Sequence, residues 1–230
     1  MIDDVRRALE VNRAAYDAIR DRFRGGMSER EAYEIVRETV DRICGDEPHE
    51  FQGDFVGGVR SAGIEGPATD LVLNDGDTLI IDLSVRRGKM WSDTCRTFFI
   101  GEPSARQRAA YETVLGCMQL GERVVHAGIV ASSLKLAMEA HLVAHGFGGR
   151  MPHHGGHLVG PLPYMKPAFE GSCHDVLADG VVCTLEPGIY FDGEWGMRVE
   201  NDYAVGPDGI TNLFDYPREI EKFILKGSGK

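Results

Sequence analysis

Five residues spread along the chain have the types and surroundings of metal ligands. Four are acidic and one is a histidine: Asp82 in LIIDLS, Asp93 in MWSDTCRTF, His157 in HHGGHLVG, Glu186 in TLEPGIY and Glu200 in MRVEND. Four carboxylates carry about four negative charges, which a protein interior does not hold without partners. Two divalent cations would balance that charge, so the set predicts a site for two metal ions.

A site of this composition indicates hydrolytic chemistry. Carboxylates with a single imidazole form a harder ligand set than a typical zinc site, which favours manganese, iron(II) or cobalt, with zinc as the further option. Two metal ions that share bridging carboxylates would bind a water between them and lower its pKa enough to give hydroxide near neutral pH. Taken singly, each acidic residue could also be a strand end or part of a polar turn.

The elements that would position these residues occur twice along the chain. Each half begins with two predicted helices and continues with strand-like segments. The helices are predicted at 1–24, 28–43, 104–126 and 132–146. Ser28 is the predicted N-cap of the second helix, because Glu31 follows three residues later in the pattern of a capping box.

The acidic residues follow the same repeat. Asp82 precedes Glu186 by 104 positions, and Asp93 precedes Glu200 by 107. This spacing favours the metal site over four unrelated strand ends. We predict two pseudo-symmetric halves, about 1–103 and 104–225, which each give one carboxylate pair to a central site within a single domain.

Strand register places the first pair. If LIIDLSVRRGKMWSDTCRTFF is an antiparallel hairpin that turns at Arg87-Gly88, opposite residues have numbers that sum to 175, as those of Asp82 and Asp93 do. The two side chains would lie directly cross-strand, with Cβ atoms about 5 Å apart. Glu186 and Glu200 would form a second such pair around Gly193, in a segment that a proline makes less regular.

The HHGGH segment predicts an irregular or extended backbone close to the site. His153 and His157 are four residues apart, but Gly155-Gly156 between them makes a regular helix unfavourable. The histidines at 126, 141 and 145 lie in or beside predicted helices, and those at 49 and 174 have no partner visible in the sequence.

Composition excludes several classes of function. The chain has 230 residues, 43% of them hydrophobic, and a formal net charge of -11, which argues against nucleic acid or an anionic membrane as partner. Its five cysteines contain no CxxC and indicate a reducing cytoplasm. We find no signal-peptide pattern and no apolar run of about 18 residues. Residues 226–230 are expected to form a flexible tail.

The strings IIDLS…SDTCRTFFIG, HHGGHLVG, LEPGIY and GMRVEND resemble, in order and spacing, the motifs of the pita-bread metallohydrolases, which include methionine aminopeptidase, aminopeptidase P, prolidase and creatinase. The resemblance covers nearly the whole chain and is nearest to the aminopeptidase P and prolidase branch. It implies an α+β fold of two αα-β halves around a curved, mainly antiparallel sheet.

The resemblance also implies roles for individual residues. Asp82 would chelate one metal ion, Asp93 and Glu200 would bridge, and His157 with Glu186 would hold the second ion. Glu186 would in addition carry the proton from the bridging water.

Further positions of the family match residues around the site. His153 matches a position that faces the substrate, and Arg198 and Tyr190 match residues that frame the site. For Arg198, a salt bridge to a neighbouring carboxylate is an equal alternative.

The chain departs from the family at two positions that normally carry substrate-binding histidines. Glu65, in SAGIEGPATD, replaces the first, and Tyr164 replaces the second, seven residues after His157. Glu65 could hold a cationic or amide group, and Tyr164 could donate a hydrogen bond to an oxyanion. In the alternative, the loops align differently and neither residue faces the site.

These observations predict a dinuclear-metal hydrolase that cleaves a C–N bond in a small peptide or amide, most simply of the Xaa-Pro kind. The first alternative is a creatinase-like hydrolase of a small non-peptide C–N compound, and the second is a metal-free binding module. Members of this branch usually carry an additional N-terminal domain, and this chain is expected to have no room for one. We therefore expect a more open site, or one covered by another subunit, for instance in a homodimer.

Overall fold

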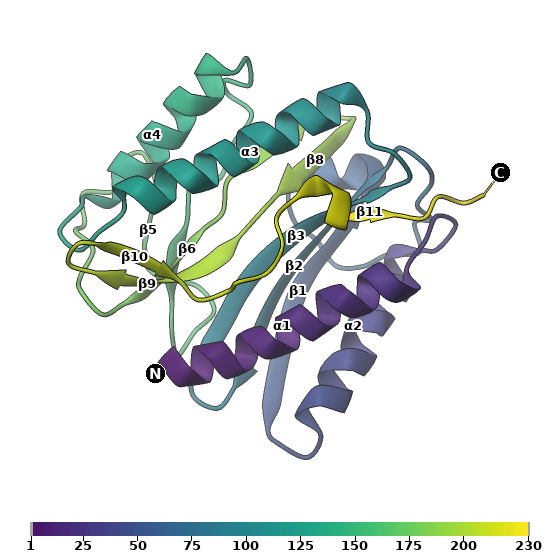
Figure 1. Ribbon diagram of the computed structural model, residues 1–230, viewed down its shortest axis with the longest axis horizontal. Coiled ribbons are helices and arrows are strands. Elements are labelled where there is room, and N and C mark those ends of the chain that lie inside the picture. The colour runs from purple at the N-terminus through teal and green to yellow at the C-terminus, as the bar shows by residue number, and fades with distance from the viewer. Residues whose placement is uncertain (1, 230) are drawn as a thin grey trace.

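The computed structural model describes residues 2–229 and shows two similar halves joined along one edge (Figure 1). The first half contains two helices, a short 3-10 helix and three long strands. Their bounds are α1 Ile2–Arg22, α2 Glu29–Cys44, β1 His49–Gly57, η1 Gly58–Gly63, β2 Thr78–Arg87 and β3 Trp91–Ile100. The three strands form an antiparallel sheet, and the short strand β11 (Ile224–Leu225) adds to β3 in parallel.

The second half repeats the order of two helices followed by strands. Its elements are α3 Ala105–Val124, α4 Ala131–Ala144, β4 His157–Val159, β5 Met165–Ala168, β6 Val182–Leu185, β7 Gly188–Phe191, β8 Trp195–Arg198, β9 Asn201–Gly206, β10 Gly209–Asn212 and η2 Ile220–Lys222. Five of these strands form a sheet in the order β10-β9-β6-β4-β5, and β7 pairs with β8. A bridge between Cys95 and Glu200 connects the two halves, so the middle of β3 meets the start of β9 at the centre.

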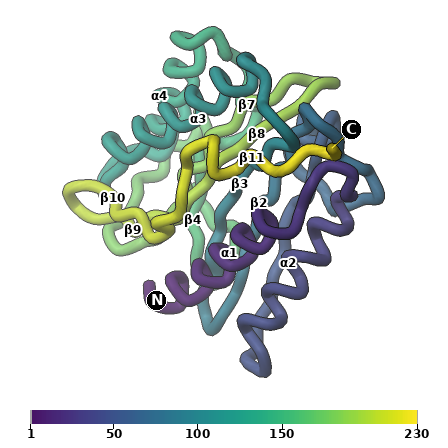
Figure 2. The backbone as a smooth tube through the Cα atoms, turned by 45° about the vertical axis from the view of Figure 1, so that its right-hand side comes forward, coloured from purple at the N-terminus to yellow at the C-terminus, as the bar shows by residue number. Residues whose placement is uncertain are grey.

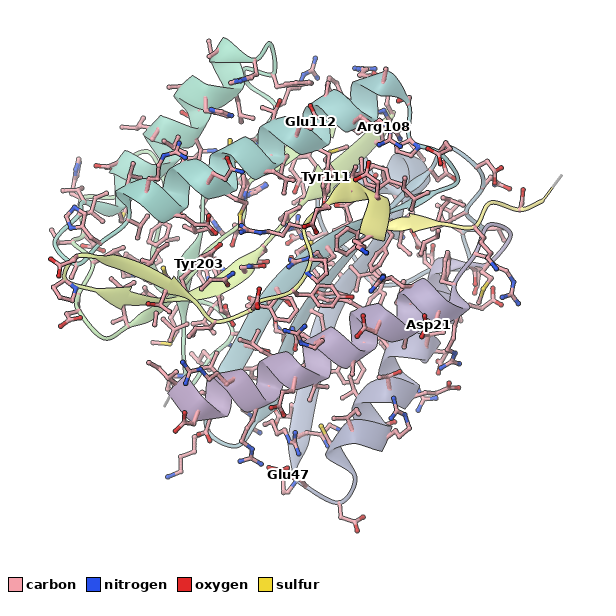
Figure 3. The ribbon with its side chains drawn as sticks, viewed as in Figure 1. Asp21, Glu47, Arg108, Tyr111, Glu112 and Tyr203 are labelled. Carbon is pink, nitrogen blue, oxygen red and sulfur yellow. The ribbon has the colours of Figure 1, made fainter. Side chains whose placement is uncertain are left out.

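Helices cover one face of this strand layer. Figure 1 shows α1 and α3 in front of the strands, and Figure 2 shows α2 beside α1 and α4 beside α3. In the stick view, Tyr111 and Tyr203 lie within the molecule, whereas Asp21 and Glu112 lie on its surface (Figure 3). The opposite face of the strand layer is not covered by these helices and can therefore carry a site.

Local capping signals fix where two of the helices begin. Ser28 caps α2 and Ser104 caps α3, each in a complete capping box, with Glu31 and Gln107 as the reciprocal partners. The prediction for Ser28 is confirmed. The four predicted helices are all present, and their bounds differ from the prediction by a few residues at most.

The predicted register of the first hairpin was wrong by two residues. Opposite residues of β2 and β3 have numbers that sum to 177, so Asp82 faces Cys95 and Asp93 faces Ser84. The chain turns through residues 87–90, with Gly88 at φ +95°, in place of a two-residue turn at Arg87-Gly88. Because the slip is an even number of residues, both aspartates stay on one face and are diagonal neighbours.

The second hairpin has the predicted register. Gly188 pairs with Arg198 and Tyr190 with Gly196, which is the predicted sum of 386 around Gly193. Glu186 and Glu200 lie just beyond the paired residues of β7 and β8. They therefore flank the hairpin and are not held as a cross-strand pair.

A buried polar cluster ties α1 to the strand that carries Asp93. Asn12 Nδ2 donates to the Leu83 carbonyl at 2.6 Å and to Thr94 Oγ1 at 2.8 Å, and the Tyr16 hydroxyl donates to the Thr94 carbonyl at 2.7 Å. Asn12, Tyr16 and Thr94 are fully buried. Satisfied polar contacts in a core specify one arrangement, so this cluster fixes β2 and β3 behind the site.

Two further observations concern the ends and the helices. In the predicted tail, Ser228 N donates to Asp75 and the Lys226 carbonyl accepts from Gly25 N, and the predicted flexibility stays a prediction. Within residues 2–229, every helix is too short or too polar to span a membrane.

Candidate metal centre

The uncovered face contains a cavity of about 320 Å³ with a strongly acidic lining. Six carboxylates line it, from Asp54, Glu65, Asp82, Asp93, Glu186 and Glu200. The lining also contains one arginine, Arg198, and three histidines, at positions 153, 154 and 157. The cavity thus brings together all five residues that the sequence predicted as metal ligands.

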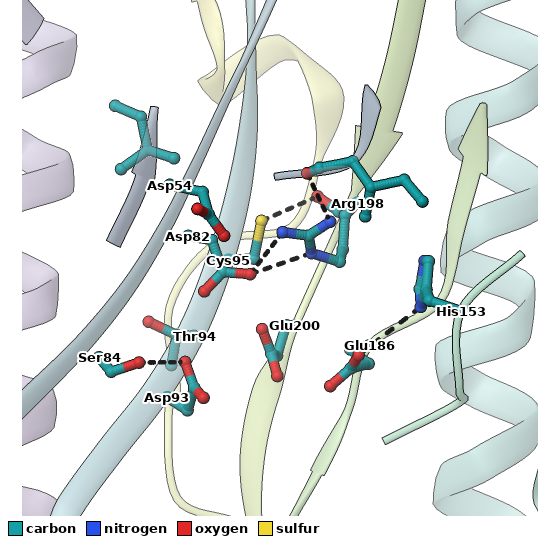
Figure 4. A network of polar contacts seen from close by, with 12 residues as sticks. Asp54, Asp82, Ser84, Asp93, Thr94, Cys95, His153, Glu186, Arg198 and Glu200 are labelled. Atoms are coloured by element: carbon teal, nitrogen blue, oxygen red, sulfur yellow. Dashed lines mark hydrogen bonds and ion pairs between the residues drawn. The ribbon is translucent and has the colours of Figure 1, made fainter. Parts of the chain in front are cut away.

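Three of the four predicted carboxylates converge on one atom of the fifth residue, Nε2 of His157. It lies 3.3 Å from Glu186 Oε2, 3.6 Å from Asp93 Oδ2 and 3.9 Å from Glu200 Oε1. Figure 4 shows Asp93, Glu186 and Glu200 side by side on three different strands or strand ends. His157 Nδ1 donates to the Leu158 carbonyl at 3.0 Å, which leaves the Nε2 lone pair directed at the carboxylates.

Hydroxyl groups orient these carboxylates from behind. Ser84 donates to Asp93 Oδ1 and Thr184 donates to Glu186 Oε2, each at 2.9 Å. The hydroxyl of Thr184 also accepts from the backbone N–H of His157 at 3.1 Å. Outer contacts of this kind fix the rotamers of metal ligands.

Asp82 lies apart from this group, in an ion pair with Arg198. Arg198 donates to Asp82 Oδ2 from Nε at 3.0 Å and from Nη2 at 2.6 Å, and it donates from Nη1 to the Tyr190 hydroxyl at 2.7 Å. Figure 4 shows this pair beside Asp54. The salt bridge that the sequence left as an alternative for Arg198 is therefore present, and its partner is the fifth predicted ligand.

The protonation of the carboxylates reflects their crowding. Burial, with added repulsion from Asp82, raises the pKa values of Asp93 and Glu200 well above their usual range. For Glu186, burial acts in the same direction, but the attraction of His157, His153 and His154 outweighs it and the pKa lies well below its usual range. Without added cations, the site therefore holds only part of its potential negative charge.

Two adjacent histidines lie against Glu186. His154 Nδ1 is 2.9 Å from Glu186 Oε1, and His153 Nδ1 is 3.6 Å from the same oxygen. His153 also donates from Nδ1 to the His154 carbonyl at 2.7 Å. Burial lowers the pKa of His153, whereas for His154 the attraction of Glu186 outweighs burial and the pKa is raised.

The predicted substrate residues have different surroundings. Glu65 and Tyr164 both line the cavity, and the Tyr164 ring centroid is 4.8 Å from that of His157. Tyr190 is buried behind Arg198 and is not among the lining residues. Two of the three therefore have access to the cavity.

Comparison with known proteins identifies the family. Residues 3–207 match the model of metallopeptidase family M24. The chain belongs to metallopeptidase family M24. An Xaa-Pro dipeptidase of Pyrococcus furiosus is 30% identical over 219 residues, which cover 95% of this chain and 63% of that protein. This M24 chain thus spans less than two thirds of the length of that relative.

Solved structures of related proteins have the same fold. The X-Pro aminopeptidase of Thermotoga maritima superimposes with a TM-score of 0.91 at 29% identity, over 97% of this chain and 62% of that one. The prolidase of Pyrococcus horikoshii gives 0.89 at 30% identity, over 95% and 63%. The predicted pita-bread fold of this M24 chain is confirmed.

The M24 chain retains a donor set that fits divalent cations. Asp93, His157 and Glu200 each offer an atom within 4.8 Å of the others, and all three residues are buried. Glu200 Oε1 has no hydrogen-bond partner among residues 2–229, although it is buried. A buried carboxylate oxygen without a donor is costly, and a cation among these three ligands would satisfy it.

Sequence reasoning missed three residues of the site. His154, Asp54 and Gln52 line the cavity, but only His154 had a visible signal, as the second histidine of HHGGH. Asp54 lies opposite Asp82 in the register of β1 and β2, and burial with repulsion from Asp82 raises its pKa to about 6. That relationship depends on the pairing of strands about 30 residues apart.

Proposed function

We propose that this chain is a divalent-metal-dependent hydrolase that cleaves a C–N bond in a small peptide or amide of the Xaa-Pro kind. The observation that carries the proposal is the convergence of three carboxylates on His157 Nε2 in an open acidic cavity. The related proteins described as Xaa-Pro dipeptidases support the substrate class.

Five residues would hold two metal ions. Asp82 would bind the first, Asp93 and Glu200 would be shared, and His157 with Glu186 would complete the second. When bound, the ions supply a water of lowered pKa for attack on the scissile carbonyl. The oxygen-rich ligand set favours manganese, iron(II) or cobalt over zinc.

The proposed role of Glu186 is to accept a proton from the attacking water and return it to the leaving nitrogen. Its lowered pKa keeps it ionised at neutral pH, as an acceptor must be. The Thr184 hydroxyl holds Oε2, which leaves Oε1 for proton transfer.

The histidine and arginine beside the site complete the proposed machinery. His153 would face the substrate, since it lines the cavity beside Glu186, and Arg198 would orient Asp82 through its ion pair. The Tyr164 hydroxyl can donate to the substrate oxygen, since its ring stands beside His157 at the cavity. Tyr190 acts through Arg198, to which its hydroxyl is bonded.

The charge of the cavity favours a substrate with a cationic group. Six carboxylates exceed the charge of two divalent ions and Arg198 by about one negative charge. Asp54 and Glu65 are the two carboxylates outside the proposed ligand set, and neither forms an ion pair within residues 2–229. A protonated amine or amidine beside Glu65 would supply the missing charge.

This feature favours a second candidate, a creatinase-like hydrolase of a small cationic C–N compound. Glu65 and Tyr164 occupy the cavity where substrate-binding histidines were expected from the resemblance. The fold and the metal ligands are the same in both candidates. Only the substrate distinguishes them.

A substrate panel tests the two candidates. Purified protein with added manganese is assayed on Xaa-Pro dipeptides, Met-peptides and small amidines, and the products are quantified by mass spectrometry. Turnover of Xaa-Pro dipeptides supports the peptidase, whereas turnover of an amidine alone contradicts it. Under the peptidase proposal, Glu65→His with Tyr164→His raises dipeptidase activity, and a fall means that these residues bind the enzyme's own substrate.

Location and partners belong to the same proposal. We propose a cytoplasmic protein that binds neither nucleic acid nor membrane, with a homodimer as the assembly to be tested against an open monomer. Light scattering of the purified protein measures the oligomeric state, and a monomer at micromolar concentration would contradict the dimer.

A further inference from the structure

We propose that Ile64 is a positioning residue, whose strained turn holds Glu65 at the cavity so that the site prefers a cationic ligand to a neutral one of the same shape. Ile64 and Glu65 both line the cavity. The strained turn is a property of the backbone alone, whereas a role for Glu65 in binding the substrate rests on the proposed function.

Ile64 has a backbone conformation that a β-branched residue rarely adopts. Its φ is +77° and its ψ is -55°, and within residues 2–229 it is the only residue other than glycine with positive φ. Glu65 N donates to the Gly63 carbonyl at 3.0 Å, which closes a three-residue turn around Ile64. The angles and the hydrogen bond are those of a γ-turn with positive φ at its centre, which is a rare and strained turn.

The Ile64 side chain packs on a small apolar cluster that is distinct from the main core. The cluster consists of the buried residues Val56, Ile80, Cys95 and Tyr190, and Ile64 is partly buried against it. Strained backbone conformations persist only where the surrounding contacts fix them. Burial of the Ile64 side chain therefore opposes relaxation of the turn to negative φ.

Hydrogen bonds on both sides restrain the backbone of Glu65. Before it, the Ile64 carbonyl accepts from Arg198 Nη1 at 3.2 Å. After it, Gly66 N donates to Asp54 Oδ1 at 2.9 Å. The turn sets the direction in which the chain enters this segment, so a change of φ at Ile64 would move Glu65 away from its place at the cavity.

Glu65 is unpaired at the cavity and is therefore available to a ligand. Within residues 2–229 its carboxylate forms no ion pair, although six carboxylates, its own included, line the cavity. A carboxylate held among like charges lowers stability, whereas a ligand cation would donate a charge-assisted hydrogen bond to it. Because the turn fixes the backbone that carries this carboxylate before a ligand arrives, less entropy is lost on binding.

Replacement of Ile64 separates the turn from the packing. Ile64→Ala keeps a Cβ at positive φ but loses the contacts of the side chain, so the turn should relax and Glu65 should move. Ile64→Gly loses the same contacts but adopts positive φ without strain, so the turn should remain. Ile64→Val retains most of the contacts. A role in packing alone predicts the opposite order, with glycine no better than alanine.

Thermal melting measures the strain. Ile64→Gly should melt about 2–4 °C above Ile64→Ala. Val59 is the matched control, because it lies in η1, is 54% exposed and does not have positive φ. There the order should be reversed, with Val59→Ala above Val59→Gly. Melting of Ile64→Ala at or above the temperature of Ile64→Gly, or failure of both variants to fold, overturns the proposal.

A matched pair of probes measures the effect on recognition. Benzamidine is cationic and benzamide is a neutral amide of the same shape, and calorimetry gives the affinity of each for the manganese-loaded protein. Wild type should bind benzamidine about tenfold more tightly than benzamide. Ile64→Ala should lose most of this preference, whereas Ile64→Gly and Ile64→Val should keep most of it and Val59→Ala should behave as wild type. In protein that already carries Glu65→Gln, Ile64→Ala should change the preference no further.

The outcomes separate this inference from the proposed function. Retention of the preference in Ile64→Ala, its equal loss in Ile64→Gly, or its absence from the wild type overturns the positioning role. A further effect of Ile64→Ala in the Glu65→Gln protein also overturns it, because Ile64 would then act through another residue. Loss of manganese from Ile64→Ala does so as well, because Ile64 would then support the metal centre. If the preference depends on Ile64 as expected but no peptide or amidine is cleaved, the proposed function fails and the positioning role stands.

Discussion

Arg198 donates two hydrogen bonds to a single oxygen of Asp82, from Nε at 3.0 Å and from Nη2 at 2.6 Å. Both side chains are largely buried, with 5% of Arg198 and 17% of Asp82 exposed. The pair connects the two halves of the molecule, since Asp82 is on β2 and Arg198 ends β8. It neutralises the one proposed ligand that lies apart from the cluster around His157.

Removal of the arginine should destabilise the metal-free protein. Arg198→Gln leaves Asp82 as a buried charge without its partner, and the free energy of unfolding in EDTA should fall by about 3 kcal/mol. Arg198→Lys retains the charge but not the two-nitrogen fork, so its loss should be smaller. Urea unfolding of both variants measures this, and addition of Asp82→Asn to Arg198→Gln should recover part of the loss. Equal stability of wild type and Arg198→Gln would show that the pair contributes nothing.

The buried Lys135 should control the loop that carries the histidines. Its Nζ donates to the carbonyls of Met151 and His153, each at 2.6 Å. Lys135→Met leaves two buried carbonyl acceptors unpaired, and each should lower the free energy of unfolding by about 1–3 kcal/mol. Because the loop is then held less firmly, manganese binding should also weaken. Glu139→Gln is the matched control, because Glu139 contacts the same lysine at 3.3 Å from a half-exposed position. Manganese titration by calorimetry compares the two, and equal affinities would mean that the lysine does not hold this loop.

Gly156 should tolerate no side chain. A Cβ there would collide with the Thr184 carbonyl and lie 2.8 Å from Phe169 Cδ2, and its φ is +155°. Gly156→Ala should therefore displace His157 and abolish manganese binding. Gly180→Ala is the control, since Gly180 also has positive φ, +78°, but open space around it. It should cost about 1 kcal/mol in backbone strain with metal binding unchanged. Manganese binding by Gly156→Ala at wild-type affinity would contradict the packing described here.

Asp54 should make the metal-free protein less stable as pH rises. Its pKa is raised in the folded state to about 6 by burial and by repulsion from Asp82, so the folded protein holds a proton that the unfolded chain releases near pH 4. The stabilising effect of that proton is complete below about pH 4 and is lost as pH rises through about 6. Asp54→Asn should melt at increasingly higher temperature than wild type from pH 4.5 to 7.5 in EDTA. A difference in melting temperature that does not change with pH would contradict this assignment.

The sequence predicted those features that depend on neighbouring residues. The capping box at Ser28 and Glu31 is complete within four residues, and the helix begins there. The candidate metal ligands were predicted because four acidic residues recur at nearly equal spacing. Three of them, Asp93, Glu186 and Glu200, converge on His157 where the two halves pair at Cys95 and Glu200.

The features that the sequence did not predict depend on loop length or on distant pairing. The predicted register of the first hairpin was wrong by two residues, because the turn spans residues 87–90. No residue type in that segment specifies how long the turn is. Because the error was an even number of residues, Asp82 and Asp93 were still predicted on the same face of the sheet, and the prediction that both belong to one site was unaffected. His154 was passed over because only the folded position of Glu186, 32 residues later, makes it part of the site.

We propose that the cavity holds two divalent ions on five ligands, of which Asp93 and Glu200 are shared. The most direct test is the manganese content of metal-reconstituted protein, measured by mass spectrometry in wild type, Asp82→Asn and Asp93→Asn. We predict about two equivalents of manganese in the wild type and about one in Asp82→Asn, because the cluster around His157 remains. Asp93→Asn removes a shared ligand and should bind fewer equivalents than the wild type. Less than one equivalent in the wild type, with no change in Asp93→Asn, would contradict the account.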